Sequence, residues 1–151
     1  MYGWWKLVHM LGVLGFLGAH GATAAVSLRL RKEHESGRIR ALLELSRSTR
    51  PWMYGSLLIL LVGGVVTGFQ GHYWGEGWIW AGLGLLVSLF VVALPLAVPY
   101  YAKLRRAVAP DAKTPKAQLE ALLSSPRPMV IAVVETLGIA VIVWLMVLKP
   151  F

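Results

Sequence analysis

The chain has 151 residues, of which 57% are hydrophobic and only 15% are charged, and its mean hydropathy is +0.64. This composition excludes an ordinary soluble domain and predicts an integral membrane protein. The net charge of +8 does not indicate nucleic-acid binding, because the basic residues are confined to connections between apolar stretches, and the lack of cysteine excludes disulfides and thiolate metal sites.

Four apolar stretches, at 4–28, 52–69, 78–101 and 128–148, can each cross a hydrocarbon core of roughly 30 Å, which takes about 20 helical residues. None alternates with a period of two residues, so each is expected to be a helix that satisfies its own backbone. We therefore predict an all-α, polytopic membrane protein in which residues 1–151 form a single transmembrane domain, a four-transmembrane-helix bundle.

Thirteen of the fifteen Lys and Arg residues lie in the first and third connections, 29–51 and 102–127. The positive-inside rule places these basic connections in the cytoplasm and both termini outside. The expected location is the bacterial cytoplasmic (inner) membrane, with multiple passes. The lipid bilayer is the expected partner; a homo-oligomer or other membrane subunits are left open, and nucleic acid is not expected.

The first stretch carries two histidines on one helical face. At about 100° per residue, five side chains fall within about 40° of one another. They are His9, Phe16, His20, Thr23 and Ser27. Ionisable side chains are costly in a bilayer, so we expect this face to point into the bundle. Glycines along the same stretch should allow close packing of neighbouring helices.

The connections and the third stretch have their own local signals. The run 41–45 in the first connection is typical of a helix, which we expect to lie partly along the lipid headgroups before Pro51 opens the next span. Pro95 and Pro99 should kink or loosen the third stretch. Thr114-Pro115 predicts the start of a short surface helix over Lys116–Leu123.

Glu135 is the only acidic residue well inside a predicted span. It lies about seven residues from the cytoplasmic end of its stretch, and His20 lies about eight residues from the end of its own. At about 1.5 Å per residue, both are roughly 10–12 Å deep. We therefore predict a buried polar pair, His20–Glu135, which either satisfies itself and does nothing else or handles a proton or orients a ligand histidine.

His9 lies about six residues below the external boundary, within reach of the short loop that carries His72 and Glu76. Together with Met10 these side chains are candidates for a metal or haem-iron site, because imidazole binds iron, copper and zinc. Histidines satisfied locally at the interface are the alternative. Because no other span contains a histidine, a single haem with His9 and another ligand, or one shared between subunits, is the haem arrangement left open.

Both ends of the chain resemble known families. Lys6-Leu-Val-His-Met-Leu-Gly12 resembles the start of a superfamily that includes HemJ-type protoporphyrinogen oxidases, CopD-like copper proteins and a family of predicted four-helix bacterial integral membrane proteins without an assigned function. Trp144-Leu-Met-Val-Leu-Lys-Pro150 is similar to the ending of that last family. The HemJ resemblance implies that His9 binds haem b. HemJ-type enzymes also depend on a lysine in the third helix, and the stretch 78–101 contains none.

Two classes of function follow from these observations. The first is a haem-linked or redox membrane protein with His9 as an iron ligand and the His20–Glu135 pair as a proton-handling or orienting group. The second is a non-catalytic accessory or scaffold subunit of a larger membrane complex, in which the glycine faces pack against partner helices. Whether the protein is an enzyme stays open at this stage.

Overall fold

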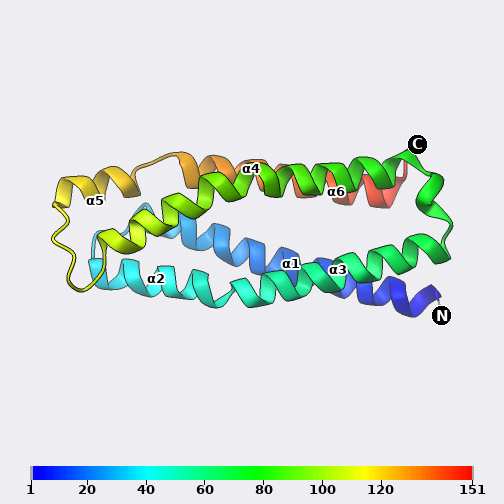
Figure 1. The fold of residues 1–151 in the computed structure, drawn as a ribbon, viewed down its shortest axis with the longest axis horizontal. Helices are drawn as coiled ribbons and strands as arrows, with labels where there is room; N and C mark the ends of the chain where they lie inside the picture. Colours follow the sequence, from blue (N-terminus) through cyan, green and yellow to red (C-terminus); the bar gives the residue numbers. More distant parts are fainter. Residues whose placement is uncertain (1, 151) are drawn as a thin grey trace.

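In a computed structural model, which describes residues 2–150, the regular structure is entirely helical (Figure 1). The elements are α1 (Tyr2–Leu30), α2 (Ser36–Ser48), α3 (Arg50–Gln70), the 3-10 turn η1 (Tyr73–Gly75), α4 (Gly77–Ala107), α5 (Lys116–Leu123) and α6 (Arg127–Leu148). Four helical segments of the described chain are long and apolar enough to cross a membrane. The predicted all-α fold with four membrane helices is therefore confirmed, and each predicted stretch falls within α1, α3, α4 or α6.

Helices α1 and α3 pack against each other along most of their length. Glycine makes this possible, because a Cβ atom on Gly63 would lie 2.8 Å from the backbone nitrogen of His9, and one on Gly12 would lie 2.7 Å from Cα of Leu60. In a bilayer, where lipid tails are as apolar as leucine, such close contact of small residues is a main source of helix association. The packing of α1 against α3 therefore depends on close contact between their backbones.

Helices α4 and α6 form the second pair, and Gly138 on α6 faces the side chain of Leu89 on α4. In Figure 1 the α4–α6 pair lies above the α1–α3 pair as a separate layer. Contacts between the two layers in the middle of the bundle are sparse; they join α1 to α6 and, through the rings of Phe16 and Phe90, α1 to α4. The molecule is thus built from two tightly packed pairs with loose packing between them.

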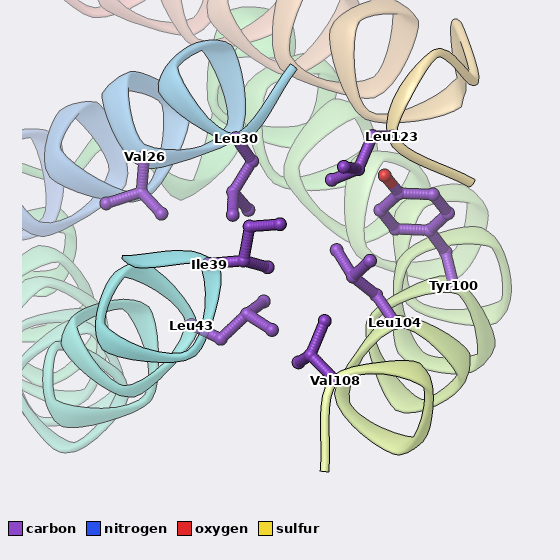
Figure 2. Close-up of a cluster of buried hydrophobic side chains, with 8 residues drawn as sticks. All are labelled: Val26, Leu30, Ile39, Leu43, Tyr100, Leu104, Val108 and Leu123. Atoms are coloured by element: carbon purple, nitrogen blue, oxygen red, sulfur yellow. The ribbon is translucent and has the colours of Figure 1, made fainter. Parts of the chain in front are cut away.

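The two pairs are joined at the end of the molecule that carries the basic connections, called here the basic end. A cluster of buried side chains joins the ends of α1 and α4 to α2 and α5 (Figure 2). Its members are Val26, Leu30, Ile39, Leu43, Tyr100, Leu104, Val108 and Leu123. Ile39 and Leu104 are fully buried in it. We call this group the basic-end core.

The basic-end core changes the interpretation of both connections. We expected α2 to lie partly along the headgroups, but it continues the direction of α3 with only Thr49 between them (Figure 1). Helix α5 has the predicted bounds but is not a simple surface helix, because its last residue, Leu123, is buried in the core. Both connecting helices are therefore parts of the packed structure.

Helix α4 reaches this core because of its direction beyond Pro95 and Pro99, both of which lie inside the helix. After these residues α4 leans away from α6 and toward α2 (Figure 1). Proline lacks the N–H that would bond the carbonyl four residues earlier, and it is the usual cause of a bend within a helix. The predicted kink thus carries Leu104 to its place against α2.

At the opposite end, where α1 begins and α6 ends, aromatic side chains connect the pairs. The rings of Tyr73 and Trp78 are 5.5 Å apart, and those of Phe69 and Trp74 are 5.3 Å apart. Lys149, just after α6, places its Nζ atom 4.0 Å from the centre of the Tyr73 ring, a cation–π contact. Both ends of the bundle are therefore closed by packed side chains.

Candidate functional site: a cavity between the helix pairs

A cavity of about 180 Å³ lies between the two helix pairs and is lined by α1, α3, α4 and α6, with one residue from α2. Most of its wall is apolar. The polar side chains on the wall are His20, Thr23, Ser27, Ser46, Arg50, Tyr54, Tyr101 and Glu135. The cavity is smaller than the roughly 300–1,000 Å³ of pockets that enclose drug-sized ligands, so it has room for a small group or a few waters.

The structure brings His20 and Glu135 together on the cavity wall. Nδ1 of His20 lies 3.9 Å from Oε2 of Glu135, and the two side chains are 14% and 27% exposed. This distance is longer than a hydrogen bond, so the two groups face each other without a direct hydrogen bond. Nε2 of His20 is buried and has no hydrogen-bond partner among residues 2–150. The carboxylate of Glu135 and an imidazole with one unpaired ring nitrogen thus face the same cavity.

Helix positions explain why these two groups meet. His20 lies on the inward face of α1, where the ring of Phe16 stacks on it with centroids 6.1 Å apart. Glu135 lies two turns into α6, on the face directed at α1. The pair therefore connects the two layers of the bundle where few other contacts do.

A second polar contact crosses the cavity closer to the basic end. The hydroxyl of Ser27 on α1 lies 2.9 Å from the carbonyl of Thr23, to which it donates, and 2.6 Å from the hydroxyl of Tyr101 on α4. Since the Ser27 proton is used by that carbonyl, Tyr101 is the donor to Ser27. The phenol oxygen of Tyr101 then keeps acceptor capacity toward the cavity.

His9 lies away from this cavity, between α1 and α3. Its Nδ1 atom is 2.8 Å from the carbonyl oxygen of Leu60, its ring lies against Gly64, and its backbone lies against Gly63. A carbonyl can only accept, so Nδ1 carries the proton and Nε2 is the nitrogen available to a ligand. This is the arrangement found in many metal-binding histidines, and it also satisfies a histidine that binds nothing.

The other candidates for an external metal site are not gathered around His9. Within residues 2–150, no group of three or more His, Cys, Asp or Glu side chains could hold a metal ion. His72 is exposed and has φ 54°, a left-handed conformation that lets the chain turn between α3 and η1. Glu76 and Met10 are also exposed. The predicted group of His9, His72 and Glu76 is therefore not assembled within one chain.

Sequence reasoning missed Arg50 and Tyr101 as cavity residues. Tyr101 is the last residue of the third predicted stretch and Arg50 belongs to a run of basic residues, and neither had a feature to distinguish it. A usable signal was the position of Arg50 directly before Pro51, which fixes it in the first turn of a membrane helix. Its direction toward the cavity depends on how the pairs are arranged, which hydropathy does not indicate.

Comparison with known proteins identifies a family for this chain. A family model described as "Predicted integral membrane protein (DUF2269)" matches residues 4–150. No curated protein and no solved structure matches the chain. The comparisons give no support for a relationship to HemJ-type oxidases or CopD-like copper proteins.

Proposed function

Because the chain belongs to the DUF2269 family of predicted integral membrane proteins, we propose that it works inside the bilayer as a binding protein whose cavity takes a small amphipathic molecule and exchanges a proton with it. The observation that carries this proposal is the meeting of His20 and Glu135, from different helix pairs, on the wall of an otherwise apolar cavity. Ionisable groups at this depth are costly, and functional sites are where they are usually kept.

The chemistry of the pair fits proton exchange. A carboxylate accepts only, whereas a neutral imidazole has one donor and one acceptor nitrogen. Moving one proton between Glu135 and His20 therefore changes what the cavity can donate to a ligand. Arg50, Tyr54 and Tyr101 line the same cavity, so five titratable or charged groups face one space.

Titration of Glu135 tests this proposal. Infrared spectra of the protein in lipid nanodiscs, recorded across pH, should show a carboxylic-acid band that is absent from E135Q and whose midpoint moves in H20A. The band should also shift in D2O, because a group on the cavity wall can exchange its proton. The matched control is E120Q, since Glu120 is exposed on α5 and pairs with Lys116.

Two results would count against proton exchange at this site. One is a spectrum of E135Q that matches the wild type at every pH. The other is a Glu135 band that H20A leaves unmoved, because that would show the two groups to titrate independently.

A haem-linked function remains a second proposal, favoured by the bond from His9 Nδ1 to the carbonyl of Leu60. That bond leaves Nε2 of His9 as the nitrogen that would bind the iron of haem b. The cavity of about 180 Å³ is lined by His20 and not by His9, so it is not the place of a haem held by His9. One chain then offers His9 alone, and the second ligand would come from another copy or another molecule.

An absorption spectrum tests the haem proposal. Protein produced with an adequate haem supply should show a Soret band that H9A loses and H72A keeps. H72A is the matched control because His72 is an exposed turn residue. A wild-type protein that stays colourless under these conditions contradicts haem binding.

The accessory-subunit alternative has its own supporting observation. Gly18 and Gly21 on α1 have no atom within 4 Å of where a Cβ would lie, so these two glycines are not used by α3. Such positions leave room for a helix of another subunit. Stable co-purification with other membrane proteins, abolished by G18L/G21L, would support this role.

A further inference from the structure

Two arginines from different helix pairs converge at the basic end of the cavity. Arg50, in the first turn of α3, lines the cavity itself. Arg105 lies one turn beyond Tyr101 on α4 and lines a neighbouring hollow of about 530 Å³. Tyr101 lines the cavity together with Arg50, and Arg105 follows Tyr101 by one turn on α4. The three side chains therefore share one small region between α3 and α4.

The charges in this region are not balanced. Arg47, near the end of α2, adds a third positive charge, and Glu44 is a carboxylate on the same hollow as Arg105. Glu44 is already within 4.0 Å of Arg47 and is largely exposed. Glu135, deeper in the cavity, faces His20. Like charges that face each other without a counterion destabilise a fold, so this region is suited to an anion.

The hydrogen bonds of the two guanidinium groups are also incomplete. Nη2 of Arg105 is buried without a partner, and the Arg50 guanidinium has no hydrogen bond or ion pair within the part of the chain that the structure describes. Buried donors are normally satisfied, and the planar guanidinium fork matches the oxygens of phosphate and carboxylate. An oxyanion between Arg50 and Arg105 would use these donors.

The space next to the arginines is apolar. Beyond Tyr101 the cavity wall is formed by side chains of α4 and α6 such as Leu89, Phe90, Leu94 and Ile131, and the cavity is partly open at the surface of the bundle. A free phosphate ion would gain nothing from this wall. An acyl chain attached to a phosphate would bury apolar surface there and extend through the opening into the bilayer.

We propose that this protein binds an anionic phospholipid, with the phosphate between Arg50 and Arg105 and part of an acyl chain in the cavity. The inference rests on the proposed function, since it names the chemical class of the molecule that occupies the same cavity. It differs from general attraction of basic connections to anionic membranes, because it depends on two particular arginines and not on net charge.

Native mass spectrometry of delipidated protein in a neutral detergent tests the proposal. The probes are phosphatidylglycerol and phosphatidylcholine with identical acyl chains. The wild type should retain phosphatidylglycerol in preference to phosphatidylcholine, and R50Q/R105Q should lose about tenfold of that preference. The control R38Q/R106Q, which removes the same charge from exposed positions, should keep it.

Stability separates binding from folding in this experiment. Removing two repelling charges should leave the melting temperature of lipid-free R50Q/R105Q equal to or above that of the wild type, while lipid retention falls. If the double variant does not fold, the single variants R50Q and R105Q give the same comparison. Equal retention in R50Q/R105Q and R38Q/R106Q would overturn the proposal.

A competition experiment with soluble phosphates distinguishes a lipid ligand from a free phosphate. Inorganic phosphate or glycerol phosphate at millimolar concentration should not displace bound phosphatidylglycerol; displacement would overturn the assignment to lipid and indicate a soluble phosphoryl ligand. The infrared titration of Glu135 tests His20 and Glu135, whereas the lipid experiment tests Arg50 and Arg105. If Glu135 shows no titration but the preference for phosphatidylglycerol is as expected, only the proton-exchange proposal is contradicted. If Glu135 titrates as expected but R38Q/R106Q loses the lipid preference as R50Q/R105Q does, only the lipid inference is contradicted.

Discussion

Replacing Gly12 with alanine is expected to lower the free energy of unfolding by about 1–3 kcal/mol, the usual cost of overpacking a tight contact. The new Cβ would lie 2.7 Å from Cα of Leu60 and 3.0 Å from the carbonyl carbon of Ile59. Both neighbours are backbone atoms of α3, which cannot rotate away as a side chain can. The helices must therefore separate, and the packing of His9 against Gly63 is lost with them.

The matched control for this variant is G18A, six residues further along the same helix. No atom lies within 4 Å of a Cβ at Gly18, so the change should be neutral, or stabilising by up to about 1 kcal/mol because alanine is the better helix former. Reversible unfolding in mixed micelles measures both variants. Equal stability of G12A and G18A would show that backbone approach does not hold α1 to α3.

Replacing Leu104 with alanine should cost about 2–5 kcal/mol, the range measured for large-to-small changes in protein cores. Leu104 is fully buried among α1, α2, α4 and α5, outside the predicted hydrocarbon span of α4. In the unfolded state this part of the chain is exposed to water and not to lipid, so burying Leu104 on folding gains the full hydrophobic free energy. The same deletion inside the bilayer would lose packing alone.

L96A is the comparison for L104A, because Leu96 lies on the same helix and is 45% exposed. Besides stability, limited trypsin digestion measures the local effect. Loosening of the basic-end core should let α2 unfold locally, so that trypsin cleaves after Arg38 and Arg40. Cleavage of L104A at the rate of the wild type would show that Leu104 does not hold α2 in place.

The sequence was sufficient for the features that depend on length and depth. Apolar runs located the four membrane helices, Pro115 located the start of α5, and equal depth indicated that His20 could meet Glu135. Each of these follows from the rise of a helix and the thickness of a bilayer.

The arrangement of the helices around one another was not predictable in the same way. Apart from the polar face of α1, apolar side chains cover all sides of these spans, so hydropathy does not reveal that α1 pairs with α3 and α4 with α6. For the same reason the contact of His9 with the carbonyl of Leu60 could not be predicted from depth alone. The basic-end core was missed because its apolar residues are scattered among charged ones in two separate connections.

The two prolines of α4 lie at the level of the cavity, and Leu94, Ala97 and Val98, which surround them, belong to its wall. Each proline removes one hydrogen bond of the helix, so bending stiffness is lowest at this level. The ends of the helix pairs are fixed by the basic-end core and by the contact of Lys149 with Tyr73. The most easily bent part of α4 therefore lies in the cavity wall, between two packed ends of the bundle. A bend at these prolines would change the cavity volume while both ends of the bundle stay closed.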